Sequence, residues 1–247
     1  MFMIKQLRVL FVFVSLLFLH SCMPKNYYQV YKAHAGEGIL IGEHDMVYED
    51  DHCKVSYDFW SEGGEFGFRF YNKTENNIYV DLERSFFIRN GAAKNYYKGR
   101  TFTNATSFGL VTSSTVSYEE ERVVCVPSHS YKFIQEYQIN EDLIRDCYLL
   151  KYPTRRQVSK IFYSQDDSPL VFSNRITYRI DGSDSLNTFE NAFYLAEVSN
   201  IPEGEMFYSR YASFCEEESM IMSSYFKTSA PNMFYIKYVG GADNWSH

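Results

Sequence analysis

Aromatic residues alternate with polar ones over much of this chain, and that alternation constrains its fold more than any other feature. In the clearest run, Phe66, Phe68 and Phe70 alternate with Gly67 and Arg69. Successive side chains of a strand point to opposite faces, so a period of two puts the three rings on one face. The 22 tyrosines and 21 phenylalanines also suit a pleated, half-buried surface. The pattern predicts an all-β fold.

Turn signals recur at short intervals between the predicted strands. Glycine-rich and asparagine-rich turns are expected at residues 61–64, 72–77 and 90–91. Strands separated in this way favour a sandwich or a barrel. Strands are predicted over residues 54–60, 66–70, 78–82, 85–88, 123–126, 131–139, 147–150, 158–163, 170–172, 175–180, 188–198, 205–214 and 233–238.

Two stretches depart from this pattern. Residues 98–118 are rich in Thr, Ser, Asn and Gly and are predicted to be a long loop, and residues 216–226 are the only predicted helix. A β-sandwich over 27–139 and a second all-β region over 140–247 are expected, with a boundary near 140.

The N-terminus has the order of a secretory signal. Lys5 and Arg8 precede an apolar run of 11 residues, Val9 to Leu19, which only Ser15 interrupts. A helix that crosses a bilayer needs about 20 apolar residues. Residues 1–21 are therefore predicted to be a signal peptide and not a permanent transmembrane anchor.

Leu19-His20-Ser21-Cys22 ends that run and resembles the bacterial lipobox. The resemblance implies a lipoprotein signal peptide, cleavage before Cys22, and acylation of Cys22 by diacylglycerol and a further chain such as palmitate. An ordinary secretory signal with a chance cysteine is the alternative. Residues 22–26 would form a short tether to the bilayer.

Residues 23–26, Met-Pro-Lys-Asn, contain no acid. In the sorting rules of related lipoproteins, an aspartate after the cysteine retains the protein at the inner membrane, and an acidic stretch promotes surface display. The expected localisation is thus the outer membrane, with the periplasmic face favoured over the cell surface.

Charge excludes one class of partner. Lys5 and Arg8 fall in the predicted signal, so the mature chain keeps 22 of the 24 basic residues against 31 acids, a net charge of −9. Because phosphate neutralisation supplies most nucleic-acid affinity, we expect no nucleic-acid partner.

Four cysteines remain once Cys22 is lipidated. An even number in an oxidising compartment permits two disulfides, and buried free thiols are the alternative. The candidates are Cys53, Cys125, Cys147 and Cys215.

The sequence contains no recognised motif for catalysis or cofactor binding. The histidines lack metal-ligand spacing, and neither a Gly-x-Ser-x-Gly elbow nor a phosphate-binding glycine loop is present. His52 and Cys53 are adjacent, so their side chains would point to opposite faces of a strand. We expect no cofactor, no metal and no catalytic residue; a hydrolase whose site is assembled only in space is the less favoured alternative.

The segment from Cys53 to Tyr97 resembles immunoglobulin-like β-sandwich domains of exported Bacteroidota proteins. Gly63-Gly64, Phe66-x-Phe68, Asn72-x-Thr74 and Asn90-Gly91 carry the resemblance, which covers under a quarter of the chain. It implies an immunoglobulin-like β-sandwich, or two packed sandwiches, and implies no activity.

Two binding functions follow from these expectations. The favoured one is a non-enzymatic, membrane-anchored module that binds or scaffolds other envelope proteins. The alternative is a surface glycan-binding or adhesin module, because sugars stack on exposed aromatic rings. Its candidate contacts are Trp60, Trp245, Tyr96 and Tyr97.

Overall fold

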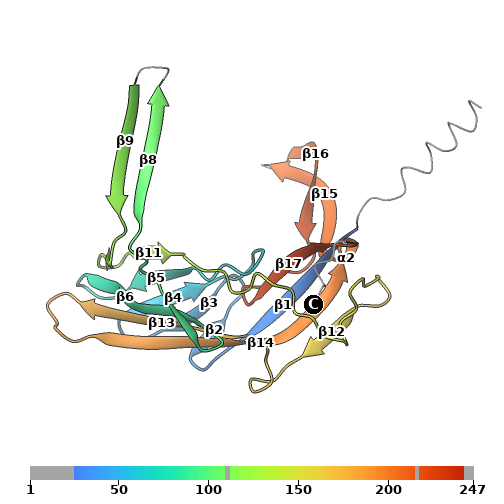
Figure 1. The fold of residues 1–247 in the computed structure, drawn as a ribbon, viewed down its shortest axis with the longest axis horizontal. Coiled ribbons are helices and arrows are strands. Elements are labelled where there is room, and N and C mark those ends of the chain that lie inside the picture. The colour runs from blue at the N-terminus through green and yellow to red at the C-terminus, as the bar shows by residue number, and fades with distance from the viewer. Residues whose placement is uncertain (1–24, 109–111, 215–216, 242–247) are drawn as a thin grey trace, which may run out of the picture.

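The computed structural model describes residues 25–108, 112–214 and 217–241, and it is all-β, as predicted. Two antiparallel sheets pack face to face as a sandwich, and two hairpins project from it (Figure 1). Rings from both sheets meet in the core: Tyr57 lies 5.5 Å from Phe193 and Phe70 lies 5.7 Å from Tyr178, between ring centroids. The predicted signal peptide, Cys22, Cys215 and Trp245 lie outside the described residues.

The larger sheet has eight strands. Its order is β10-β6-β13-β14-β1-β17, with β7 beside β6 and β12 beside β14. The bounds are β1 Asn26–Ala35, β6 Ile78–Arg89, β7 Ala92–Asn95, β10 Val123–Val126, β12 Ser159–Phe162, β13 Val171–Ile180, β14 Asn187–Pro202 and β17 Met233–Val239.

The smaller sheet has five strands in the order β11-β5-β4-β3-β2. The bounds are β2 Ile39–Ile41, β3 Met46–Glu49, β4 Cys53–Tyr57, β5 Phe68–Asn72 and β11 Tyr131–Ile134.

The larger sheet takes strands from both sides of residue 140. β1 pairs with β14 and β17, and β6 pairs with β13. Residues 27–139 and 140–247 therefore build one sheet jointly, and the sandwich does not divide at the boundary expected there.

Residues 78–88, predicted as two strands, form the single strand β6. A register shift in its pairing with β13 marks the place where the prediction broke the strand. Ser85 stabilises this irregularity, because its hydroxyl donates to the Asp81 carbonyl at 2.6 Å and accepts from the Thr177 N–H at 3.0 Å. The turn predicted at Asn90-Gly91 follows, with both residues at positive φ.

Two other predictions were wrong. The stretch 98–118, expected to be a loop, contains the hairpin of β8 (Thr101–Phe108) and β9 (Thr112–Glu119). Residues 217–226, expected to be helical, form strand β16 (Glu217–Phe226), which pairs with β15 (Phe207–Phe214). The helix of the described part is the single turn α2 (Glu203–Met206). In both hairpins the pairing between the two strands determines the β structure. A short stretch of sequence does not show which strands pair.

The core is built largely of aromatic rings. Phe66, Phe68 and Phe70 are fully buried, which confirms the inward face predicted from their spacing. Phe193 is in ring contact with Phe59 and Phe66 and stacks on Phe172 at 5.4 Å. Such interlocking rings fill the space between the sheets with large apolar area.

The segment 140–157 is held on the larger sheet by buried polar side chains. Gln29 is fully buried; its amide donates to the Ile144 carbonyl at 2.9 Å and accepts from the Ile144 N–H at 2.7 Å. Asn200 donates to the Leu150 carbonyl at 3.0 Å, and the Tyr238 hydroxyl donates to the Lys151 carbonyl at 2.7 Å. This segment includes residues 147–150, which were predicted as a strand. In the structure they have no regular secondary structure and are held on the sheet by side-chain hydrogen bonds.

Within the described ranges, no helix has both the length and the apolar character that a membrane crossing requires.

Candidate binding surface

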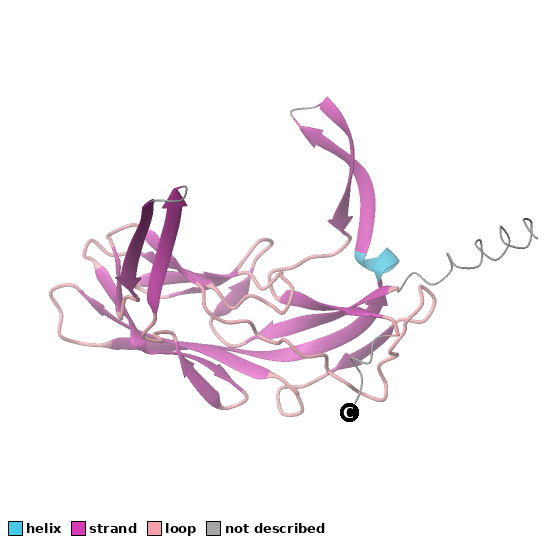
Figure 2. Cartoon of the chain, turned by 45° about the horizontal axis from the view of Figure 1, so that its top comes forward, coloured by secondary structure: helices cyan, strands magenta, loops and turns pink. Residues whose placement is uncertain are grey.

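Two hairpins rise from one face of the sandwich, near its opposite ends (Figures 1 and 2). We call β8–β9 the first arm and β15–β16 the second arm. Each strand of the first arm has eight residues, which at about 3.4 Å per residue corresponds to about 27 Å. Among the described residues neither arm pairs with a third strand.

An ion cluster fixes the base of the first arm. The Arg100 guanidinium binds the carboxylates of Glu120 at 2.5 Å and Glu136 at 2.6 Å, and the Lys98 ammonium binds Glu136 at 2.6 Å. The Glu120 carboxylate also accepts from the backbone N–H groups of Lys98 and Arg100. Because Arg100 lies just before the arm and Glu120 just after it, the cluster joins both ends of the arm to the sandwich.

Glu120 stays ionised in this cluster. Burial by itself raises the pKa of its carboxyl, but the hydrogen bonds from the Arg100 side chain and from the two backbone N–H groups outweigh burial, and the pKa is lowered. Glu120 is therefore a structural contact between the two ends of the arm.

An open groove of about 790 Å³ lies at the foot of the first arm. Charged side chains of both signs and the ring of Tyr137 line it. The Lys98 ammonium lies 4.5 Å and the Lys94 ammonium 5.9 Å from the centre of that ring. The other charged lining residues are Glu62, Glu65, Arg89, Glu136, Glu141 and Asp142.

A second groove, of about 560 Å³, lies on the outer face of the smaller sheet. Phe133 and Arg69 line one part of it, and Asp45, Asp58 and Glu65 supply carboxylates. Phe133 shares its outward face with Tyr131, two residues earlier on β11; both rings are more than half exposed. Arg69 covers the Tyr131 ring at 5.0 Å.

The rings expected to contact a glycan are not brought together. Tyr96 is buried in the core, 5.6 Å from Phe68, so it is corrected from a surface contact to a core residue. Trp60 is half-buried and packs edge-on against Phe226 at 5.0 Å. Tyr97 is half-buried under the Arg122 guanidinium, at 5.3 Å. Trp245 lies outside the described residues.

Sequence reasoning missed Tyr131 and Phe133. A strand is predicted over residues 131–139, but its spacing does not say which face meets solvent; β11 is an edge strand, and these two rings point outward. The neighbouring Ile134, opposite Phe68, faces inward and is buried.

Cys53, Cys125 and Cys147 are free thiols in the structure, so no disulfide joins any two of them; the fourth candidate, Cys215, lies beyond the described ranges. Cys53 is fully buried, and burial followed by the nearby Asp50 carboxylate raises the pKa of its thiol. A thiol held protonated in this way is a poor nucleophile.

No cluster of three or more His, Cys, Asp or Glu that suits a metal ion occurs in the part of the chain that the structure describes. The structure thus defines a β-sandwich that carries two hairpin arms and two open polar grooves. Comparison with family models, curated proteins and solved structures finds no match for it.

Proposed function

We propose that this chain is an exported lipoprotein, anchored to the outer membrane through Cys22, that binds another envelope protein with its first arm. The observation that carries the binding role is the first arm itself. It extends away from the sandwich core, yet its base is fixed by the cluster of Arg100, Glu120 and Glu136.

The exposed backbone of the first arm suits strand pairing with a partner. A two-stranded hairpin gains little stability alone and leaves N–H and C=O groups free along both edges. A partner that adds a strand to either edge satisfies those groups. Thr103 and Ser117, whose hydroxyls lie 3.1 Å apart across the strands, add hydrogen-bonding groups to the exposed surface of the arm.

The groove at the foot of the arm extends this surface. It offers a tyrosine ring between two lysines, with carboxylates nearby. Charges of both signs beside an aromatic ring match the mixed rim and aromatic anchor of protein–protein interfaces.

Excision of the first arm tests this role. The Glu120 N–H already donates to the Arg100 carbonyl at 2.9 Å, so residues 101–119 can be replaced by Asn-Gly without moving the sandwich. We expect an unchanged thermal midpoint, but loss of the partner adduct that a photo-crosslinking amino acid at position 94, in the groove at the foot of the arm and outside the excised residues, forms in cells.

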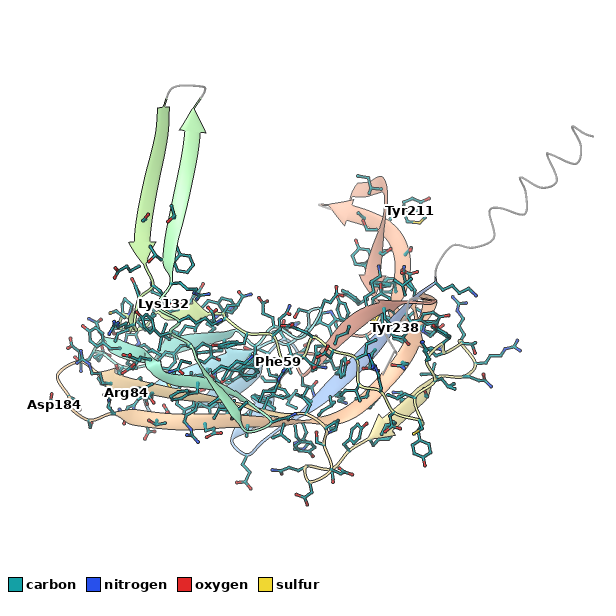
Figure 3. The ribbon with its side chains drawn as sticks, viewed as in Figure 1. Phe59, Arg84, Lys132, Asp184, Tyr211 and Tyr238 are labelled. Carbon is teal, nitrogen blue, oxygen red and sulfur yellow. The ribbon has the colours of Figure 1, made fainter. Side chains whose placement is uncertain are left out.

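The matched control carries the same crosslinker at Asp184, in the turn between β13 and β14 and outside both arms (Figure 3). An adduct from position 184 but none from position 94 would contradict a binding role for the arm. The same adduct with and without the arm would contradict it as well.

A glycan-binding role is the second candidate, and a different observation favours it. Tyr131 and Phe133 present two exposed rings on one face beside a groove with three carboxylates. Phe133→Ala is expected to abolish retardation in polysaccharide affinity gels, because it removes a stacking platform. Leu40→Ala, at another exposed apolar position, on edge strand β2, serves as the control. Equal migration of wild type and Phe133→Ala on every polysaccharide would contradict the glycan-binding role.

A further inference from the structure

We propose that the second arm, Phe207–Phe226, inserts side chains into the interfacial layer of the bilayer that holds Cys22, and so orients the sandwich on the membrane. The inference rests on the proposed lipid anchor. It assigns to the second arm a partner different from that of the first arm.

The second arm starts beside the beginning of the described chain. The Asn26 side chain donates to Glu203 of α2 at 3.0 Å, and α2 leads directly into β15. The Gly240 N–H donates to the Lys25 carbonyl at 2.8 Å, which also holds the beginning of the described chain in place. Cys22 precedes Asn26 by four residues, which span at most about 14 Å. A lipidated Cys22 therefore keeps the base of the second arm close to the membrane surface, whereas the first arm lies near the other end of the sandwich (Figure 1).

The base of the second arm is rigid. Phe207 and Phe226 are in ring contact at 4.8 Å and pack against Tyr28 and Tyr235. The Lys227 N–H closes the hairpin on the Met206 carbonyl at 2.9 Å. The arm therefore leaves the sandwich in a fixed direction.

The outer part of the arm exposes apolar side chains. Tyr211 and Met222 are register partners and share one face, and each is more than half exposed. Ile221 adjoins Met222 at the register shift of the hairpin, and its side chain is 69% exposed. Exposed apolar side chains at this end of the arm suit the interfacial layer of a bilayer.

The lower part of the arm has the composition of a membrane interface. Tyr208 and Tyr225 stack at 5.7 Å, and the Arg210 guanidinium lies over the Tyr225 ring at 4.4 Å. Tyrosine and arginine concentrate at the headgroup level of membranes. The free edges of a two-stranded ribbon exclude a deeper position, because their N–H and C=O groups find no partners in hydrocarbon. The arm therefore lies in the interface and does not cross the membrane.

Tryptophan quenching by brominated lipid tests this placement. The full lipidated chain, with Ile221→Trp, is reconstituted into phosphatidylcholine vesicles whose acyl chains are brominated close to the glycerol. We expect the emission that the new tryptophan adds over wild type to be mostly lost, relative to vesicles of unbrominated lipid. Asp184→Trp, in the distant turn between β13 and β14, is expected to keep its emission.

Flotation of the same vesicles separates the two proposals. A chain that does not float with vesicles contradicts the lipid anchor. A chain that floats, with Ile221→Trp unquenched or with positions 221 and 184 quenched equally, overturns the insertion of the second arm and leaves the anchor standing. Because Ile221 is exposed, the tryptophan leaves the fold intact, and an unchanged thermal midpoint verifies this.

Discussion

The Cys22→Ala variant is expected to move this chain almost completely from the membrane fraction to the soluble fraction. The lipobox resemblance assigns two or three acyl chains to Cys22, and each buried methylene contributes about 0.8 kcal/mol to membrane binding. The apolar side chains of the second arm are too few to replace several acyl chains.

The measurement is fractionation of cells together with metabolic labelling by an alkyne analogue of palmitate. Cys147→Ala is the matched control, because Cys147 is a free and exposed thiol of the described chain. It is expected to keep both the label and the membrane fraction. Label retained on Cys22→Ala, or Cys22→Ala found in the membrane fraction, would contradict the anchor.

An impermeant protease applied to intact cells then determines the orientation. Protection of the wild type until the outer membrane is broken is the expected result and supports the periplasmic face. Cleavage on intact cells places the chain at the surface, which favours the glycan-binding candidate.

Raising the pH above about 10 is expected to unfold this protein cooperatively. Five tyrosines are at most 2% exposed, and burial is the largest cause that raises the pKa of each hydroxyl: Tyr31, Tyr57, Tyr96, Tyr178 and Tyr238. Burial, then the charge of Glu203, also raises the pKa of Tyr28 to about 12.

The sign follows from proton counting. Above pH 10 the unfolded chain loses these protons while the folded chain keeps them, so stability falls as the pH rises. Below pH 10 both states are protonated, and the stabilisation is fully present. Each tyrosine contributes about 1.4 kcal/mol per pH unit, or about 7 kcal/mol per unit for five. A typical domain has only about 5–15 kcal/mol of stability, so one or two pH units suffice.

Tyrosinate absorbance and circular dichroism, followed together from pH 8 to 12, measure this effect. One steep transition is expected in both signals at the same pH. A smooth absorbance titration of all tyrosines with the circular dichroism unchanged would contradict the buried positions of these rings.

Much of the sandwich was predictable because its strands carry their own pattern. Phe66, Phe68 and Phe70 share a face by spacing alone, and Asn90-Gly91 marks a turn by backbone preference alone. In these places the local sequence and the tertiary environment favour the same structure, so a short stretch of sequence is enough to predict it.

The first arm and the second strand of the second arm differ from the prediction for a common reason. Neither arm lies over the core, so a strand in it need not alternate between buried and exposed positions, and its partner strand supplies the hydrogen bonds. Residues 98–118 are predicted as a loop from their Thr, Ser, Asn and Gly content and residues 216–226 as a helix, whereas the strand predicted at 205–214 is confirmed by β15. Pairing between strands depends on register, which a local window does not contain.

The sequence by itself determined the all-β class and the inward face of the central phenylalanines, because each depends on neighbouring residues only. Tertiary structure alone decided that Tyr96 is core and Phe133 is surface, that Arg100 joins Glu120 to Glu136, and that β1 closes the sheet with β14 and β17. The physical reason is that a period of two divides a strand into two faces, whereas the packing of distant strands decides which face meets solvent.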